Sequence, residues 1–224
     1  MKLAFQAFAF SLVFSSPALA TLDCHLQTSR SGDAPAVCAY FAGIGSAPYR
    51  NWYDDNGIEA KYSSRVYLQG SDPNHPENGA AVHWKVEGKY VYLAVAARAT
   101  GWLGFGIAEV VGMLGADMAI FEAARPQQIV DAHTSDIRLP IADDCPSDWE
   151  LLTSDVDEGG GFIMIEFKRL LDTKDPQDKV IFCASALIPP TRGVAAWATT
   201  GSIVLEERFD SLAPVMTRQH LTKL

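Results

Sequence analysis

A methionine between two glycines is a candidate for metal chemistry in this sequence. The stretch GMLGADMAIF, residues 112–121, places Met113 between Gly112 and Gly115. A thioether is a soft ligand for haem iron and other transition metals, and methionine also fills irregular gaps in hydrophobic cores. Met113 is therefore a candidate metal or haem ligand, with core packing as the alternative.

Two histidines on predicted strands could complete such a site. His83 alternates with Val82 and Trp84, so its side chain is expected on the opposite face of the strand. His133 ends the run IVDAH, close in sequence to Asp131. Imidazole is a common metal ligand, and a surface or hydrogen-bonded histidine is the alternative for each.

Acidic and aromatic side chains could line a ligand pocket. Asp117 and Asp131 could bind ligand hydroxyls or a hard cation such as Ca²⁺, whereas capping of turns is the structural alternative. One or two of the tryptophans on predicted strands could stack on a sugar or a porphyrin, and core packing is the alternative for all four: Trp84, Trp102, Trp149 and Trp197. The sequence has no Gly-x-Ser-x-Gly or His-Glu-x-x-His motif, so no hydrolase site is indicated.

The first twenty residues have the pattern of a secretory signal peptide. Lys2 is followed by an apolar run from Leu3 to Phe14 and by the small-x-small triplet Ala18-Leu19-Ala20. A membrane anchor is the alternative, but the run is shorter than the roughly 20 residues that a span requires. We therefore expect a secreted, extracellular protein with no membrane span.

The cysteines and the charge agree with that compartment. Four cysteines, Cys24, Cys38, Cys145 and Cys183, predict two disulfides, and the pairing of Cys24 with Cys38 and of Cys145 with Cys183 closes the shorter loops. Metal-ligand spacings such as CxxC are absent, which disfavours zinc. A formal net charge of −9 without a basic patch argues against nucleic-acid binding.

The elements that must position these residues are short strands. Alternating apolar residues predict a hairpin over 80–97 with its turn at Glu87-Gly88, and another over 148–171 with its turn at 158–161. Further strands are predicted in GWLGFGIA, ADMAIFEA, QQIVDAH, KVIFCASAL, GVAAWATT and SIVLEERF. The glycines of GWLGFGIA predict close backbone approach or a bend. Only FKRLLDT predicts a short helical turn, so the fold class is an all-β antiparallel sandwich.

Five segments in order resemble a known family: GWLGFGIAEVVGMLGADMAIF, IVDAHTSD, DWELL, FIMIEFKRLLDTKDPQDKVI and VAAWATTG. They resemble the DOMON domain, the N-terminal module of dopamine β-hydroxylase-like monooxygenases, and more distantly the cytochrome domain of cellobiose dehydrogenase. The resemblance implies an immunoglobulin-like β-sandwich with a ligand between its sheets. That ligand is b-type haem, held by one methionine and one histidine, in cytochrome members, and is thought to be a sugar in others.

The resemblance assigns roles to particular residues. Met113 matches the haem-ligating methionine of the cytochrome members, and Asp117 and Asp131 are family positions. The histidine expected near Arg208 is absent, which leaves His83 and His133 as candidate substitutes.

The expected organisation is a signal peptide (1–20), an irregular extension packed on the core (21–78), a DOMON domain (79–210) and a C-terminal tail (211–224). The copper-binding catalytic domains of the monooxygenases would follow the DOMON module, and the sequence ends soon after it, so no copper hydroxylation is expected. The leading hypothesis is a non-catalytic protein that binds haem or a sugar. The alternatives are an extracellular b-type cytochrome with a redox partner and a structural domain without a ligand.

Overall fold

The computed structural model describes five ranges of the chain with their side chains: 34–70, 72–107, 115–134, 140–143 and 146–181. It also describes the backbone of residues 108, 192–198, 209–210 and 213–214. The predicted signal peptide, Met113, Cys24, Cys145 and Cys183 lie outside the described residues, and Trp197 is described by its backbone alone. None of the described helices is long and apolar enough to cross a membrane.

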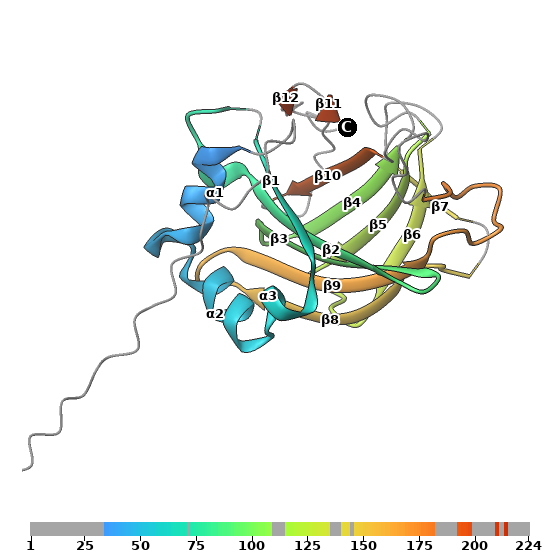
Figure 1. Ribbon diagram of the computed structural model, residues 1–224, viewed down its shortest axis with the longest axis horizontal. Helices are drawn as coiled ribbons and strands as arrows, with labels where there is room; N and C mark the ends of the chain where they lie inside the picture. The colour runs from blue at the N-terminus through green and yellow to red at the C-terminus, as the bar shows by residue number, and fades with distance from the viewer. Residues whose placement is uncertain are drawn as a thin grey trace, which may run out of the picture.

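Two five-stranded antiparallel sheets form the body of the molecule (Figure 1). The first sheet has the order β1 (Ser64–Leu68), β2 (Ala80–Glu87), β3 (Tyr90–Arg98), β9 (Phe162–Leu170) and β8 (Glu150–Asp157). The second has the order β10 (Arg192–Ala198), β4 (Trp102–Ala108), β5 (Asp117–Glu122), β6 (Ile129–His133) and β7 (Ile141–Ala142). A separate pair joins β11 (Phe209–Asp210) to β12 (Ala213–Pro214). The predicted all-β sandwich is confirmed.

Both predicted hairpins are present, with glycines where their turns need them. The β2–β3 turn holds Gly88 at φ +60°, and the β8–β9 turn ends at Gly161 at φ +70°. These are left-handed conformations that glycine adopts without steric cost. The predicted helical turn in FKRLLDT is wrong, because its first residues belong to β9, which pairs with β3 and with β8. Strand pairing on both sides outweighs a weak local helix preference.

The hydrophobic core between the sheets is built from alternate residues of the central strands. Inward-facing, buried side chains come from both layers: Val91, Leu93, Val95, Leu103, Phe105, Ile107, Ala119, Phe121, Ile163, Ile165 and Phe167. The rings of Phe105 and Phe167 meet across the layers at 6.1 Å between centroids. Burial of each large apolar side chain contributes about 1.5–3 kcal/mol, so this contact holds the two sheets together.

The close backbone approach predicted from the glycines of β4 is confirmed at Gly106. A Cβ atom added there would lie 2.9 Å from Met118 Cγ and 3.1 Å from the carbonyl oxygen of Asp117. Any larger residue would therefore push β4 away from β5.

A layer of short helices covers the outer face of the first sheet (Figure 1). It comprises α1 (Pro35–Ala42), η2 (Ile44–Ser46), α2 (Ala47–Asp55) and α3 (Ile58–Lys61), and η3 (Pro76–Asn78) precedes β2. The rings of Phe41, Tyr49 and Trp52 pack against this face, where Ala81 and Ala94 leave them room. The sequence did not predict these helices, because they are short and lie in a stretch rich in turn residues, and because Pro35 and Pro48, which are typical of turns, stand in the first two positions of α1 and α2.

Cys38 lies in the helical layer. It is buried beside Val37 and Phe41 and is disulfide-bonded. Because the other three cysteines lie outside the described residues, the pairing of Cys24 with Cys38 and of Cys145 with Cys183 stays a prediction.

Candidate functional site

An ion pair is buried between the sheets at one end of the sandwich. Asp117 is the first residue of β5 and Arg169 lies near the end of β9, and both side chains are fully buried. Strand alternation directs both inward, because Ala119 and Phe167, two residues away on the same strands, belong to the core between the sheets. Arg169 Nη1 donates to Asp117 Oδ2, so the pair joins the two layers.

Other groups complete the hydrogen bonding of this pair. Trp149 Nε1 donates to Asp117 Oδ1 over 3.1 Å, and the backbone N–H of Lys179 donates to Oδ2 over 2.9 Å. The guanidinium of Arg169 stacks over the Trp149 ring at 4.7 Å and donates through Nη2 to the carbonyl of Lys179. Burial lowers the pKa of Arg169 to about 10, so it remains a cation at neutral pH. Both buried charges are therefore compensated.

Two further aspartates lie beside the ion pair. Asp131, on β6, is 6% exposed, and its Oδ2 accepts the backbone N–H of Asp148 over 2.7 Å. Asp178 lies in the segment after β9, with its Oδ2 3.6 Å from Arg169 Nη1. Carboxylate oxygens of Asp117, Asp131 and Asp178 all lie within 4.8 Å of one another. Three acids thus converge on one point at the end of the sandwich.

The surroundings of these three aspartates disfavour ionisation of all three at once. Burial is the main cause that raises the pKa of Asp131 to about 7, and the charges of Asp178 and Asp143 add to it. Burial also raises the pKa of Asp178, against the lowering effects of the nearby Thr173 side chain and of Arg169. The site therefore favours a positive charge or a proton close to Asp131.

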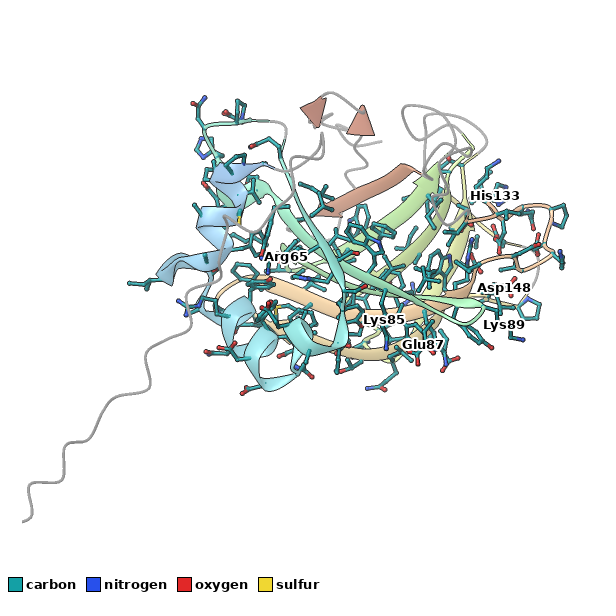
Figure 2. All side chains as sticks on the ribbon, viewed as in Figure 1. Arg65, Lys85, Glu87, Lys89, His133 and Asp148 are labelled. Atoms are coloured by element: carbon teal, nitrogen blue, oxygen red, sulfur yellow. The ribbon has the colours of Figure 1, made fainter. Side chains whose placement is uncertain are left out.

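His133 lies at the same end, one strand from Asp117, with which it pairs across β5 and β6. Figure 2 shows His133 and Asp148 at this end of the molecule. The Nδ1 atom lies 2.5 Å from Asp143 Oδ1 and 3.3 Å from Gln177 Nε2, whereas Nε2 has no hydrogen-bond partner among the described residues. A carboxylate on one ring nitrogen orients the other nitrogen toward a ligand, as in many metal sites.

His83 lies elsewhere, on the outer face of the first sheet beneath α2. Its Nε2 is hydrogen-bonded to the hydroxyl of Tyr49 at 2.9 Å, and the two rings stack. Burial lowers the pKa of His83 to about 3, with a smaller contribution from the charge of Arg65. The structure does not bring the two candidate histidines together. His83 lies on the outer face of the first sheet, whereas His133 lies on β6 of the second sheet.

Comparison with known proteins gives this architecture a family. Residues 77–187 match the family model of the DOMON domain. This region is a DOMON domain. The resemblance seen in the sequence is thereby confirmed, although no curated protein matches the chain.

A solved DOMON-type structure also resembles the chain. It is the cytochrome domain of Myriococcum thermophilum cellobiose dehydrogenase, with 10% sequence identity and a TM-score of 0.39. The similarity covers 65% of this chain and 78% of that one. A likeness of this size carries no argument about the ligand.

The predicted tryptophans of the DOMON domain have different surroundings. Trp84 is half-buried and packs against the core between the sheets. Trp102 is buried on β4 in the opposite phase to Leu103 and Phe105, and the backbone of Trp197 on β10 pairs with Leu103.

Sequence reasoning missed two of the residues that surround Asp117 in the DOMON domain, Arg169 and Asp178, and did not connect Trp149 with Asp117. One signal could have found Arg169, since it continues the inward phase of Ile165 and Phe167 in the run FIMIEFKRL. An arginine on an apolar face requires a buried partner. Nothing in the spacing marks Trp149 or Asp178 as neighbours of Asp117.

Proposed function

We propose that this DOMON protein is secreted and binds a small ligand, haem or a sugar, at the end of the sandwich that carries His133. The observation that supports it is the orientation of His133, whose Nδ1 is held by Asp143 while Nε2 is not engaged by a described residue. Such an imidazole is prepared to bind a metal through its second nitrogen.

Haem is the first candidate ligand, and it needs a second axial ligand besides His133. The N–H of Gly115, two residues after Met113, donates to the carbonyl of Thr134 over 2.8 Å, and Thr134 follows His133 directly. This hydrogen bond joins Gly115 and Thr134, which are close in sequence to Met113 and His133. The two side chains are our candidates for the axial ligands. Bound haem would supply reversible one-electron transfer, at a potential that a Met/His pair raises.

His83 is less suited to bind iron. Its Nε2 is already hydrogen-bonded to Tyr49, and it lies beneath the helical layer rather than at the end of the sandwich. Iron binding there would require Tyr49 and Tyr53 to move out of a packed aromatic cluster.

A sugar is the second candidate, and Asp131 favours it. Oδ1 of this carboxylate has no hydrogen-bond partner among the described residues, so it can accept a ligand hydroxyl. Trp84, half-buried against the inner core, is a candidate surface for stacking.

Absorption spectroscopy of the full chain, expressed with added haem, tests the proposal. We expect a Soret band that shifts on reduction with dithionite. Met113→Ala and His133→Ala should each abolish the native spectrum, whereas His75→Ala, which removes an exposed histidine, should leave it unchanged. An unchanged spectrum in Met113→Ala would refute its assignment as a ligand.

A colourless wild-type protein would remove both haem and the electron-transfer role, and a glycan-binding screen would then test the sugar. Binding of neither would leave a structural domain. The mass of the N-terminal peptide of the exported protein tests secretion, because we expect cleavage after Ala20.

A further inference from the structure

We propose that Asp131 and Asp178, with Asp117 as a third carboxylate, bind a hard divalent cation of the Ca²⁺ type at the end of the DOMON sandwich. This inference does not rest on haem at His133, and it assigns to a cation the Asp131 Oδ1 atom that a sugar hydroxyl would otherwise contact. It rests on the convergence of three acids, on buried oxygens that lack donors, and on the local balance of charge.

The separation of the oxygens fits one ion. Ca²⁺ takes oxygen ligands at about 2.3–2.6 Å, so two ligands on opposite sides of it are about 5 Å apart. The oxygens of Asp117, Asp131 and Asp178 lie within 4.8 Å of one another. An ion among these oxygens would therefore lie close to bonding distance from all three side chains.

The hydrogen bonding separates these acids into two kinds. Both oxygens of Asp117 accept hydrogen bonds, from Trp149 and from the backbone of Lys179 as well as from Arg169. By contrast, Asp131 Oδ1 and both oxygens of Asp178 are buried and accept no hydrogen bond of normal geometry from a described residue.

The side chains that carry these oxygens are among the most buried acids described. Asp131 is 6% exposed, and the Asp178 side chain is 2% exposed. A buried carboxylate oxygen without a donor is costly, and native structures satisfy such atoms with a proton, a water or an ion. Because Asp131 and Asp178 both carry such oxygens and also belong to the converging group of three acids, a single ion could satisfy them together.

The charges at this point favour a cation. Arg169 contacts Asp117 and lies 3.6 Å from Asp178, and no ion pair between Arg169 and Asp131 is present in the described part of the chain. One guanidinium therefore faces three carboxylates. A divalent ion between Asp131 and Asp178 would neutralise the excess negative charge.

The donor types select the class of metal. All three converging side chains are carboxylates, which are hard ligands preferred by Ca²⁺, Mg²⁺ and Mn²⁺. Thiolate and imidazole, which zinc prefers, are not among them. Ca²⁺ is favoured over Mg²⁺ because it tolerates an irregular ligand set, whereas Mg²⁺ requires nearly ideal octahedral geometry at about 2.1 Å.

Calorimetric titration of CaCl₂ into the full chain, after treatment with a chelator, tests the site. We expect saturable binding of about one Ca²⁺ per chain and a rise in Tm when Ca²⁺ is added. Asp131→Asn and Asp178→Asn should weaken binding by at least about tenfold and abolish the rise in Tm. Asp155→Asn removes the same charge from an exposed position on β8 and should behave as the wild type does.

Each alternative has its own signature. Asparagine is nearly isosteric with aspartate, so both variants should fold in chelator, and circular dichroism verifies this.

A wild-type protein that is folded but shows no heat of binding and no Tm shift with Ca²⁺ overturns the proposal. Binding of Ca²⁺ by Asp131→Asn and Asp178→Asn as tightly as by the wild type also overturns it. A proton shared by the acids would appear as a rise in Tm of Asp131→Asn with no effect of Ca²⁺. Stronger binding of Mg²⁺ or Zn²⁺ than of Ca²⁺ would overturn the assigned class.

Discussion

Trp149, the residue directly before β8, donates its indole N–H to Asp117 Oδ1 on the opposite sheet over 3.1 Å. The same carboxylate accepts a hydrogen bond from Arg169, whose guanidinium stacks on the Trp149 ring. Three side chains from β5, β9 and the start of β8 thus form one buried polar unit. This unit fixes how the two layers meet at the end that carries the candidate site.

Arg169→Met is expected to destabilise the protein strongly. It leaves the Asp117 carboxylate buried without its charged partner, and loss of one member of a buried pair costs about 3–5 kcal/mol in free energy of unfolding. Urea unfolding measures this. Lys168→Met, one residue earlier and in a surface pair with Glu150, should cost less than about 1 kcal/mol. Similar losses for the two variants would show that Arg169 does not stabilise the fold through Asp117.

Trp149→Phe separates the hydrogen bond from the packing. The phenyl ring still contacts Arg169 and Phe167, but Asp117 Oδ1 loses its donor, and we expect a loss of about 1–3 kcal/mol. Trp84→Phe removes the same indole N–H at a site where it makes no described hydrogen bond, and should cost less. We expect a lower urea midpoint for Trp149→Phe than for Trp84→Phe. The reverse order would contradict the role assigned to the indole N–H of Trp149.

Acid should weaken the fold through His83. Its pKa is about 3 in the folded protein and 6.5 in an unperturbed chain. The unfolded chain therefore binds a proton first as the pH falls. The contribution of His83 is present above about pH 6.5 and is lost progressively toward about pH 3, by at most about 1.4 kcal/mol per pH unit.

His83→Gln tests this sign, because glutamine can keep a hydrogen bond to Tyr49 but does not titrate. The free energy of unfolding, measured in urea from about pH 7 to about pH 4, should fall less steeply in the variant than in the wild type. If the free energy of unfolding fell equally steeply with pH in the variant and the wild type, His83 would not be held neutral in the folded protein.

Asp143→Asn tests how His133 is positioned. If His133 binds haem iron, loss of the carboxylate on Nδ1 should weaken haem retention by about 10–100-fold without removing the ligand itself. Transfer of haem to an apoprotein acceptor measures retention. Asp155→Asn is the matched control, and equal retention by the two variants would contradict the role given to Asp143.

The sequence predicted the local parts of this fold and missed its long-range ones. The hairpins follow from alternation and from turn glycines such as Gly88, and alternation correctly separated His83 from Val82. The helical layer was missed because α1 is apolar on most sides and begins at a proline. Asp178 was missed for another reason: it meets Asp117 and Asp131 only after the two sheets stack, and no local pattern encodes such a meeting.

The aromatic layer on the first sheet has a practical consequence. The family match begins at residue 77, after β1 and the three α-helices. A polypeptide trimmed to that boundary would expose Ala81, Ala94, Ala96, Phe162 and Met164 to water on a face that is now covered. Such a fragment would have an exposed apolar sheet face and an unpaired edge at β2, so we expect it to aggregate. The recognisable domain is therefore smaller than the unit that can exist alone in solution.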